Sequence, residues 1–150
     1  MNIQEHTTPN KLERYSFLWS EARLLIAAVA LFIGGVPPVL AFNPVSAFYS
    51  LLSSLLTLCW IISGVASVYL LYRWNKNGKK LFAVSKQYDT AAFLVMIVTG
   101  FNLGITGLIG TNIGMSIFSG RLIFTIGGAI YLITLYYLHT RWNESGKKLF

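Results

Sequence analysis

The fold is decided by the stretch LLIAAVALFIGGVPPVLAFNPVSAFYSLLSSLLTLCWIISGVASVYLLY, residues 24–72, which contains no Asp, Glu, Lys or Arg. An α-helix needs roughly 20 apolar residues to cross a hydrocarbon core about 30 Å thick. The stretch is therefore too long for one membrane span and long enough for two. Asn43-Pro44 lies between its two halves and is typical of a turn.

The composition of the whole chain also indicates an integral membrane protein. Of its 150 residues, 55% are hydrophobic and only 11% are charged, whereas about 25% of the residues of an average soluble domain are charged. A second charge-free stretch separates Asp89 from Arg121. The sequence therefore predicts an all-α fold with four transmembrane helices, at about residues 22–42, 46–72, 89–110 and 117–140.

Residues 1–21 are polar and mixed in charge, so they precede the first predicted span. Thr8-Pro9 suits a helix start, and Leu12, Tyr15 and Trp19 recur at near-helical spacing. Two interpretations stay open for this segment: a cytoplasmic tail, or a short helix lying on the membrane surface.

The basic residues predict the orientation of the chain. Three of the twelve Lys and Arg precede the first span, five lie between the second and third, three follow the fourth, and Arg121 falls on the other side. By the positive-inside rule, both termini are expected to be cytoplasmic and the loops at Asn43 and Asn112 external. The predicted location is the inner (cytoplasmic) membrane of the cell.

A ten-residue phrase occurs twice, as RWNKNGKKLF at residues 73–82 and as RWNESGKKLF at residues 141–150. Each copy follows an even-numbered span, and aligning the copies also pairs Tyr69-Leu70 with Tyr137-Leu138. The chain is therefore predicted to be a duplicated helical hairpin, with both copies in the same orientation about an axis along the membrane normal. The two hairpin repeats are expected at residues 22–82 and 83–150.

The residue types of the repeated phrase are typical of a helix that leaves the membrane. Asn followed by Gly suits the end of a helix, Arg and Trp suit the headgroup region, and each Lys near an anionic leaflet contributes about 1 kcal/mol. The final Leu-Phe is expected to dip back toward the acyl chains. The candidate residues for lipid-headgroup anchoring are Arg73, Trp74, Lys79, Lys80, Arg141, Trp142, Lys147 and Lys148.

The third predicted span and the turn after it contain candidate helix-packing residues. Asn102 is an amide inside a span, so it needs a partner and is expected to link the third and fourth spans. Small residues three or four apart let another backbone approach closely; here they are Gly100, Gly104 and Gly107. Packing within the second hairpin is preferred, and packing against another subunit stays open. Arg121 is expected to cap the outer turn near Asn112 or to contact lipid phosphate.

Motifs in the second half of the chain resemble a known family. They are Asn-Leu-Gly-Ile-Thr-Gly-Leu at residues 102–108, Asn112, Phe118, Gly-Arg-Leu-Ile at residues 120–123 and Tyr-Leu at residues 131–132. This pattern resembles the small two-helix bacterial membrane proteins catalogued as domain of unknown function 378, best over residues 90–140. Leu103 stands where that family has Trp, and Asn112 where an acidic residue is common. The resemblance implies a hairpin fold in a bacterial-type membrane, here as a tandem duplication, and it implies no activity.

Groups suited to catalysis or metal binding are scarce in this sequence. Cys59 is the only cysteine and lies between Leu58 and Trp60, and the two histidines, His6 and His139, are far apart in the chain. No catalytic triad, paired carboxylates or metal-ligand spacing is present. We therefore expect no catalytic residues, no metal, no cofactor and no nucleic-acid partner, and we expect that the protein is not an enzyme.

Two classes of function remain. The preferred one is a structural or accessory membrane protein that self-associates or packs as a subunit of a larger membrane complex, because small-residue seams are present. The alternative is a transporter or channel for a small neutral or weakly polar solute, along a serine-rich face of the second span. That face comprises Ser46, Ser50, Ser53, Ser54 and Thr57, and transport gains support if it lines a cavity. The expected partners are membrane lipids, with anionic headgroups on the cytoplasmic side, and further copies of the chain or other membrane subunits.

Overall fold

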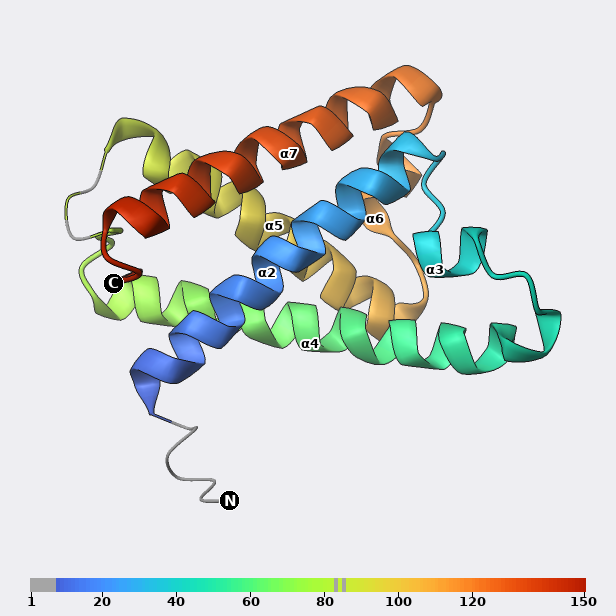
Figure 1. Ribbon diagram of the computed structural model, residues 1–150, viewed down its shortest axis with the longest axis horizontal. Helices are drawn as coiled ribbons and strands as arrows, with labels where there is room; N and C mark the ends of the chain where they lie inside the picture. The colour runs from blue at the N-terminus through green and yellow to red at the C-terminus, as the bar shows by residue number, and fades with distance from the viewer. Residues whose placement is uncertain (1–7, 83, 85) are drawn as a thin grey trace.

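The computed structural model spans residues 1–150 and describes residues 8–82, 84 and 86–150. Four long helices dominate, and no strand occurs among the described residues. They are α2 (Pro9–Phe32), α4 (Tyr49–Lys76), α5 (Gln87–Ile109) and α7 (Arg121–Glu144), connected by the short helices α3 (Pro38–Ala41) and α6 (Ile113–Ile117) and the 3-10 helix η1 (Ser46–Phe48) (Figure 1). Each long helix is long and apolar enough to cross a membrane. The predicted all-α fold with four helices of membrane-spanning length is confirmed.

The first long helix differs most from its prediction. It begins at Pro9, where proline suits the first helical position, and runs without a break to Phe32. Gly34 and Gly35 follow with φ of 94° and 86°, a backbone region that a helix does not use. One helix therefore joins the expected surface segment to the first span, and it ends earlier than residues 22–42 predict. The first seven residues of the expected tail lie outside the described residues.

Each long helix packs most extensively against a helix of the other hairpin: α4 against α5, and α2 against α7. Where α4 crosses α5, a Cβ added to Gly104 would lie 2.7 Å from the Gly64 Cα. A Cβ added to Gly107 would lie 3.0 Å from the backbone nitrogen of Ile61. The predicted glycine seam is therefore used, but Gly100, Gly104 and Gly107 face α4 of the first hairpin. The expectation that they pack within the second hairpin is wrong.

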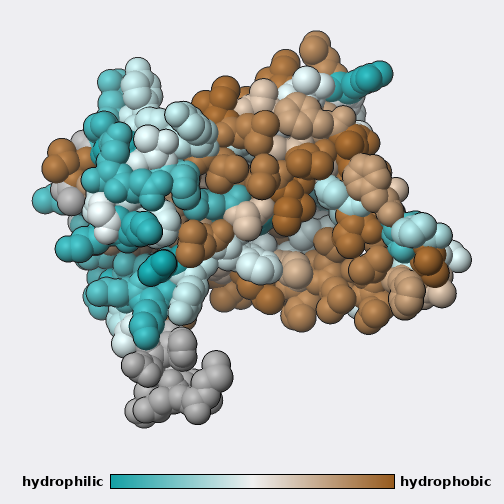
Figure 2. All heavy atoms as spheres, viewed as in Figure 1, coloured by the Kyte–Doolittle hydropathy of each residue, from teal (hydrophilic) through white to brown (hydrophobic). Residues whose placement is uncertain are grey.

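Polar residues gather at one end of the bundle. Figure 2 shows hydrophilic residues crowded at the end that holds the C-terminus and the loop between α4 and α5, and mostly hydrophobic residues over the rest of this face. A bundle that crosses a bilayer exposes such an apolar belt to the hydrocarbon core. The distribution agrees with a multi-pass membrane protein.

Both copies of the repeated phrase end their helix with the same hydrogen bonds. The amide of the fifth residue donates to the carbonyl of the first (3.0 Å in each copy), the sixth to the third (3.2 and 3.1 Å) and the seventh to the second (2.9 Å in each). The sixth residue, Gly78 or Gly146, has a φ of 67° in both copies. This is the Schellman arrangement, which favours glycine at that position. The expected helix end is confirmed, and the matching bonds are what a duplicated hairpin predicts.

Candidate functional site

Two arginine–carboxylate ion pairs join the long helices at the polar end of the bundle. Arg73 on α4 pairs with Glu13 on α2, and Arg141 on α7 pairs with Asp89 on α5. The second pair is bidentate, with Arg141 Nε 2.8 Å from Asp89 Oδ1 and Nη2 3.0 Å from Oδ2. Asp89 is fully buried and also accepts a 2.9 Å hydrogen bond from the Tyr137 hydroxyl. Because each arginine opens a copy of the repeated phrase, the phrase supplies one cation to each pair.

The aromatic residues of the repeated phrase pack against each other inside the bundle. The Phe17 ring centroid lies 5.5 Å from that of Trp142 and 6.4 Å from that of Phe82, so one ring contacts both copies of the phrase. Phe93 contacts the other Trp and the other terminal Phe of the two copies, at 5.6 and 6.2 Å. In addition, the Phe82 amide donates a 2.8 Å hydrogen bond to the Leu149 carbonyl. The two copies of the phrase therefore meet in one cluster.

This burial corrects part of the predicted lipid anchoring. Arg141 and Trp142 are buried, and the Leu-Phe ends of both copies pack into the core instead of turning toward acyl chains. Arg73 and Trp74 are half-buried, since the first pairs with Glu13 and the second packs on Phe93. The remaining candidates are exposed, and lipid binding by them stays a prediction. They are Lys79, Lys80, Lys147 and Lys148.

Asn102 organises the connection at the other end of the bundle. Its side-chain nitrogen donates to Asn112 Oδ1 at 2.8 Å, and its side-chain oxygen accepts from the Gly114 amide at 3.0 Å. Asn112 also caps α6 by accepting from the Met115 amide at 3.0 Å. The amide of Asn102 therefore links α5 to α6. The expected link to the fourth span is wrong, because the turn itself supplies both partners.

Two further expectations concern the half of the molecule away from the polar end. Arg121 is exposed, and its guanidinium makes no hydrogen bond or ion pair within the described part of the chain, so it does not cap the turn at Asn112, and contact with lipid phosphate stays a prediction. The serine-rich face of α4 does not line the cavity described below. Instead, Ser54 and Thr57 donate to the carbonyls of Ser50 and Ser53 in their own helix, each at 3.0 Å.

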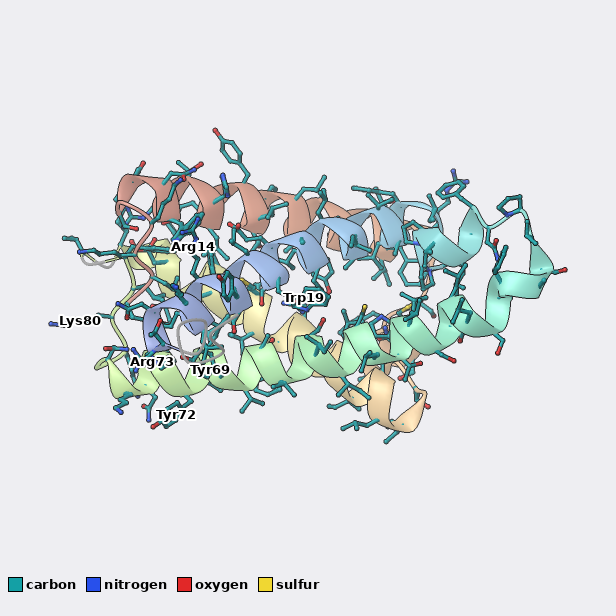
Figure 3. All side chains as sticks on the ribbon, turned by 60° about the horizontal axis from the view of Figure 1, so that its bottom comes forward. Arg14, Trp19, Tyr69, Tyr72, Arg73 and Lys80 are labelled. Atoms are coloured by element: carbon teal, nitrogen blue, oxygen red, sulfur yellow. The ribbon has the colours of Figure 1, made fainter. Side chains whose placement is uncertain are left out.

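A cavity of about 660 Å³ lies between α2, α4, α5 and α7, with α3 and α6 at one end. Its walls are mainly aliphatic and aromatic, for example Ile26, Leu103 and Phe124. Trp19, labelled in Figure 3, projects from α2 toward α4 and donates a 3.0 Å hydrogen bond to Ser63 Oγ. The cavity wall is therefore mainly hydrophobic. Polar groups lie near Trp19 and Arg23 at one end, and the side chains of Asn102, Thr106 and Asn112 lie toward α6.

Arg23 is the charged residue of this cavity. It lies within α2, with 6% of its surface exposed, and was counted among the residues flanking the first span in the sequence-based orientation. Its guanidinium donates to Thr99 Oγ1 at 3.1 Å and to the Met96 carbonyl at 2.7 Å, while its buried Nε has no acceptor. Tyr131 of α7 lines the same cavity. Hydrogen bonds therefore hold the two Nη atoms of Arg23 in place, whereas its Nε has no acceptor.

Arg23 has no acidic partner among the described residues. Each of the four acidic side chains in that part of the chain has a basic partner other than Arg23, so the positive charge of Arg23 stays uncompensated. A buried charge without a counter-ion is costly, above all inside a membrane. The pairs are Glu13–Arg73, Asp89–Arg141, Glu144–Arg141 and Glu21–His139.

Sequence reasoning missed Arg23, although a signal was present. Glu13, Phe17, Ser20, Leu24 and Ala28 are buried and recur every three or four residues along α2. This helical period begins well before the first charge-free stretch. It would have placed the polar residues before residue 24 on an inward face of one long helix.

No family model, curated protein or solved structure matches the chain. The resemblance described for residues 90–140 therefore stays an expectation. Among the described residues, no group of three or more His, Cys, Asp or Glu side chains is placed to hold a metal ion. The site consists of an apolar cavity with one uncompensated cation, Arg23.

Proposed function

We propose that the protein binds a small, mainly apolar molecule within the membrane, in the cavity between its four long helices. The observation that carries this proposal is the cavity itself, whose volume of about 660 Å³ falls in the range of roughly 300–1,000 Å³ that small-molecule sites occupy. Its walls are mostly hydrophobic, with a few polar groups among them, as in most ligand sites. Such binding is the step that a carrier or receptor for the same molecule requires.

This proposal replaces the structural or accessory function as the preferred one. The sequence favoured self-association because glycines three and four residues apart suit close helix contacts. Gly104 and Gly107 make those contacts with α4 of the same chain, so this seam is not available to a second copy. Packing as a subunit of a larger membrane complex stays a prediction without this support.

For the location we propose the inner (cytoplasmic) membrane, with both termini on the cytoplasmic side. Support comes from the positive-inside rule, since the loop between α4 and α5 and the end of α7 are rich in Lys and Arg. The test uses Thr111→Cys and Lys148→Cys, each in a Cys59→Ser background and at exposed positions. A membrane-impermeant maleimide is expected to label only Thr111→Cys in intact cells, and labelling of Lys148→Cys alone would reverse the orientation.

The binding proposal is tested with 1-dodecanol, a neutral amphiphile, and the purified full chain. Native mass spectrometry is expected to show saturable uptake of one dodecanol per chain. Ala27→Phe puts a large ring on the cavity wall and is expected to abolish uptake. Ala129→Phe makes the same change on an exposed face of α7 outside the cavity and is the matched control. Equal uptake by the wild type and Ala27→Phe would refute the proposal.

A further inference from the structure

We propose that the cavity takes a single-chain anionic amphiphile, whose carboxylate or phosphate head binds Arg23 and whose chain lies along the apolar walls toward α3 and α6. This inference rests on the proposed function, because it names the class of molecule that fills the same cavity. It adds one claim that can fail independently, namely that the ligand carries a negative charge at the Arg23 end.

The depth of Arg23 makes its charge unusual. Glu13 belongs to the polar end of the bundle, and Arg23 follows it by ten residues on the same helix, a rise of about 15 Å. That distance is about half of a hydrocarbon core about 30 Å thick. A long side chain can reach the headgroups from near a helix end, but Arg23 is buried against Met96 and Thr99 and points into the protein. Its charge therefore stays at membrane depth.

The hydrogen bonds of Arg23 are incomplete. A guanidinium has five N–H donors, and only two acceptors contact Arg23 among the described residues, the Thr99 hydroxyl and the Met96 carbonyl. Its Nε and the nearby Ser67 Oγ are buried without partners. Carboxylates and phosphates satisfy such free donors in pairs and supply the missing negative charge. A neutral ligand would satisfy donors but would leave the charge uncompensated.

The packing around Arg23 leaves room for the guanidinium but not for an acidic side chain. A Cβ added to Gly100 would lie 2.8 Å from an Nη atom of Arg23 and would also collide with Ser67. The glycine at this position therefore lets the guanidinium lie directly against α5. Because α5 presents a bare backbone here, it offers no counter-ion at this position, and the cavity that Arg23 lines is the open space from which one can be supplied.

The length and lining of the cavity indicate the size and polarity of the ligand beyond its head group. Arg23 precedes the end of α2 at Phe32 by nine residues, so the adjoining wall extends for about 14 Å. The wall residues beyond Arg23, such as Ala27, Leu31 and Met115, carry no charge. An alkyl chain suits this lining, and the volume of about 660 Å³ suits a drug-sized molecule. A two-chain phospholipid is larger than such a molecule.

The test measures affinity of the full chain in phosphatidylcholine nanodiscs for four ligands with the same chain. They are dodecanoate, dodecyl phosphate, 1-dodecanol and dodecyltrimethylammonium. Charge-assisted hydrogen bonds are expected to make both anions bind at least about tenfold more tightly than the alcohol. The cation is expected to bind most weakly. Equal binding of dodecanoate and dodecanol would overturn the anionic head and leave the proposed function standing, whereas no saturable binding of any ligand would refute both.

Substitutions then assign the head to Arg23. Arg23→Gln is expected to lower dodecanoate affinity at least about tenfold, to the level of dodecanol, while dodecanol binding stays unchanged and shows that the cavity is intact. Arg14→Gln removes an exposed charge from the same helix and is the matched control. An anion preference that survives Arg23→Gln would overturn the role of Arg23. If Arg23→Gln does not fold, comparing the affinities of the wild-type chain for the anion and for the cation still tests whether the cavity prefers a negative charge.

Two competitors distinguish whether the anionic group belongs to a free anion, to a single-chain amphiphile or to a bilayer phospholipid. Inorganic phosphate alone is expected not to displace dodecyl phosphate at matched concentration, because the chain contributes through apolar contact. Displacement would overturn the amphiphile and identify a free anion. Phosphatidic acid in the nanodisc is expected to compete weakly, and competition equal to that of dodecyl phosphate would overturn the single chain in favour of a bilayer lipid.

Discussion

Arg141 and Arg23 are both more than nine-tenths buried, with 7% and 6% of their surfaces exposed, but their surroundings differ. Arg141 has the fully buried carboxylate of Asp89 beside it, whereas Arg23 has only a hydroxyl and a carbonyl. A buried cation with a carboxylate partner draws two helices together, and one without a partner attracts an anion from elsewhere. The polar end of the bundle is therefore closed by its own charges, while the cavity half is suited to a ligand.

The largest effect is expected from Asp89→Asn, which would remove the buried carboxylate partner of Arg141 and leave it only the exposed carboxylate of Glu144. Removing one partner of a buried ion pair is expected to lower the free energy of unfolding by about 3 kcal/mol. Denaturant unfolding in micelles of fixed composition measures the loss. Glu144→Gln removes the exposed carboxylate that also contacts Arg141 and should change little. Similar unfolding of both variants would show that the polar end does not depend on a buried pair.

Gly104→Ala tests whether the close contact between the backbones of α4 and α5 stabilises the bundle. The new methyl group would lie 2.7 Å from the Gly64 Cα, so the backbones must separate. The expected loss in unfolding free energy is about 1–3 kcal/mol. Gly127→Ala is the control, because its methyl group meets only the flexible end of Leu31, at 3.3 Å. A Gly104→Ala protein as stable as the control would contradict this close contact.

Glu13→Gln sharpens the comparison by testing the more open of the two ion pairs. The side chain of Arg73 is 18% exposed and that of Arg141 only 8%, so water replaces part of the lost interaction at Arg73. The expected loss in unfolding free energy is about 1–2 kcal/mol, less than for Asp89→Asn under the same conditions. A loss as large as that of Asp89→Asn would show that the ion pairs of the two copies of the phrase contribute equally to stability.

The smallest effect on folding is expected from changing Lys79, Lys80, Lys147 and Lys148 together to Ala, because these charges lie outside the bundle. The unfolding free energy should change by no more than about 0.5 kcal/mol, while binding to anionic lipid should weaken by about 1 kcal/mol per lysine. Lipid retention in native mass spectrometry and maleimide labelling of topology measure the change. Arg121→Ala, at the opposite end, is the control. Unchanged lipid retention would leave the lysines without an anchoring role.

The sequence predicts most helices of this protein well because a membrane span is determined by the residues within it. The charge-free stretch at residues 24–72 contains the end of α2 and the start of α4. The stretch between Asp89 and Arg121 contains the end of α5, and α7 starts directly after it at Arg121. The end of each even-numbered helix was also predictable, since a glycine with positive φ leaves a local signature. The bounds of α4, α5 and α7 lie close to the predicted ones, whereas α2 begins and ends earlier than predicted.

Partners that are distant in the chain were not predictable in the same way. Arg141 has a residue type typical of the headgroup region, and only the fold brings Asp89 to it. Gly104 signals a close contact without saying that Gly64 makes it. Arg23 was assigned to a flank because the span was assumed to begin where charges end, whereas α2 begins at Pro9 and turns its charges inward.

The hydrogen bond from the Phe82 amide to the Leu149 carbonyl bears on how the protein is made. A ribosome releases α2 and α4 before α5, α7 and Leu149 exist, and domains begin to fold as they emerge. During that interval the glycine face of α4 and the end of the first repeated phrase lack their final neighbours. The first hairpin therefore enters the membrane as an unfinished half. The glycine face of α4 can pack once α5 has been synthesised, whereas the hydrogen bond of the Phe82 amide has to wait until Leu149 has been synthesised.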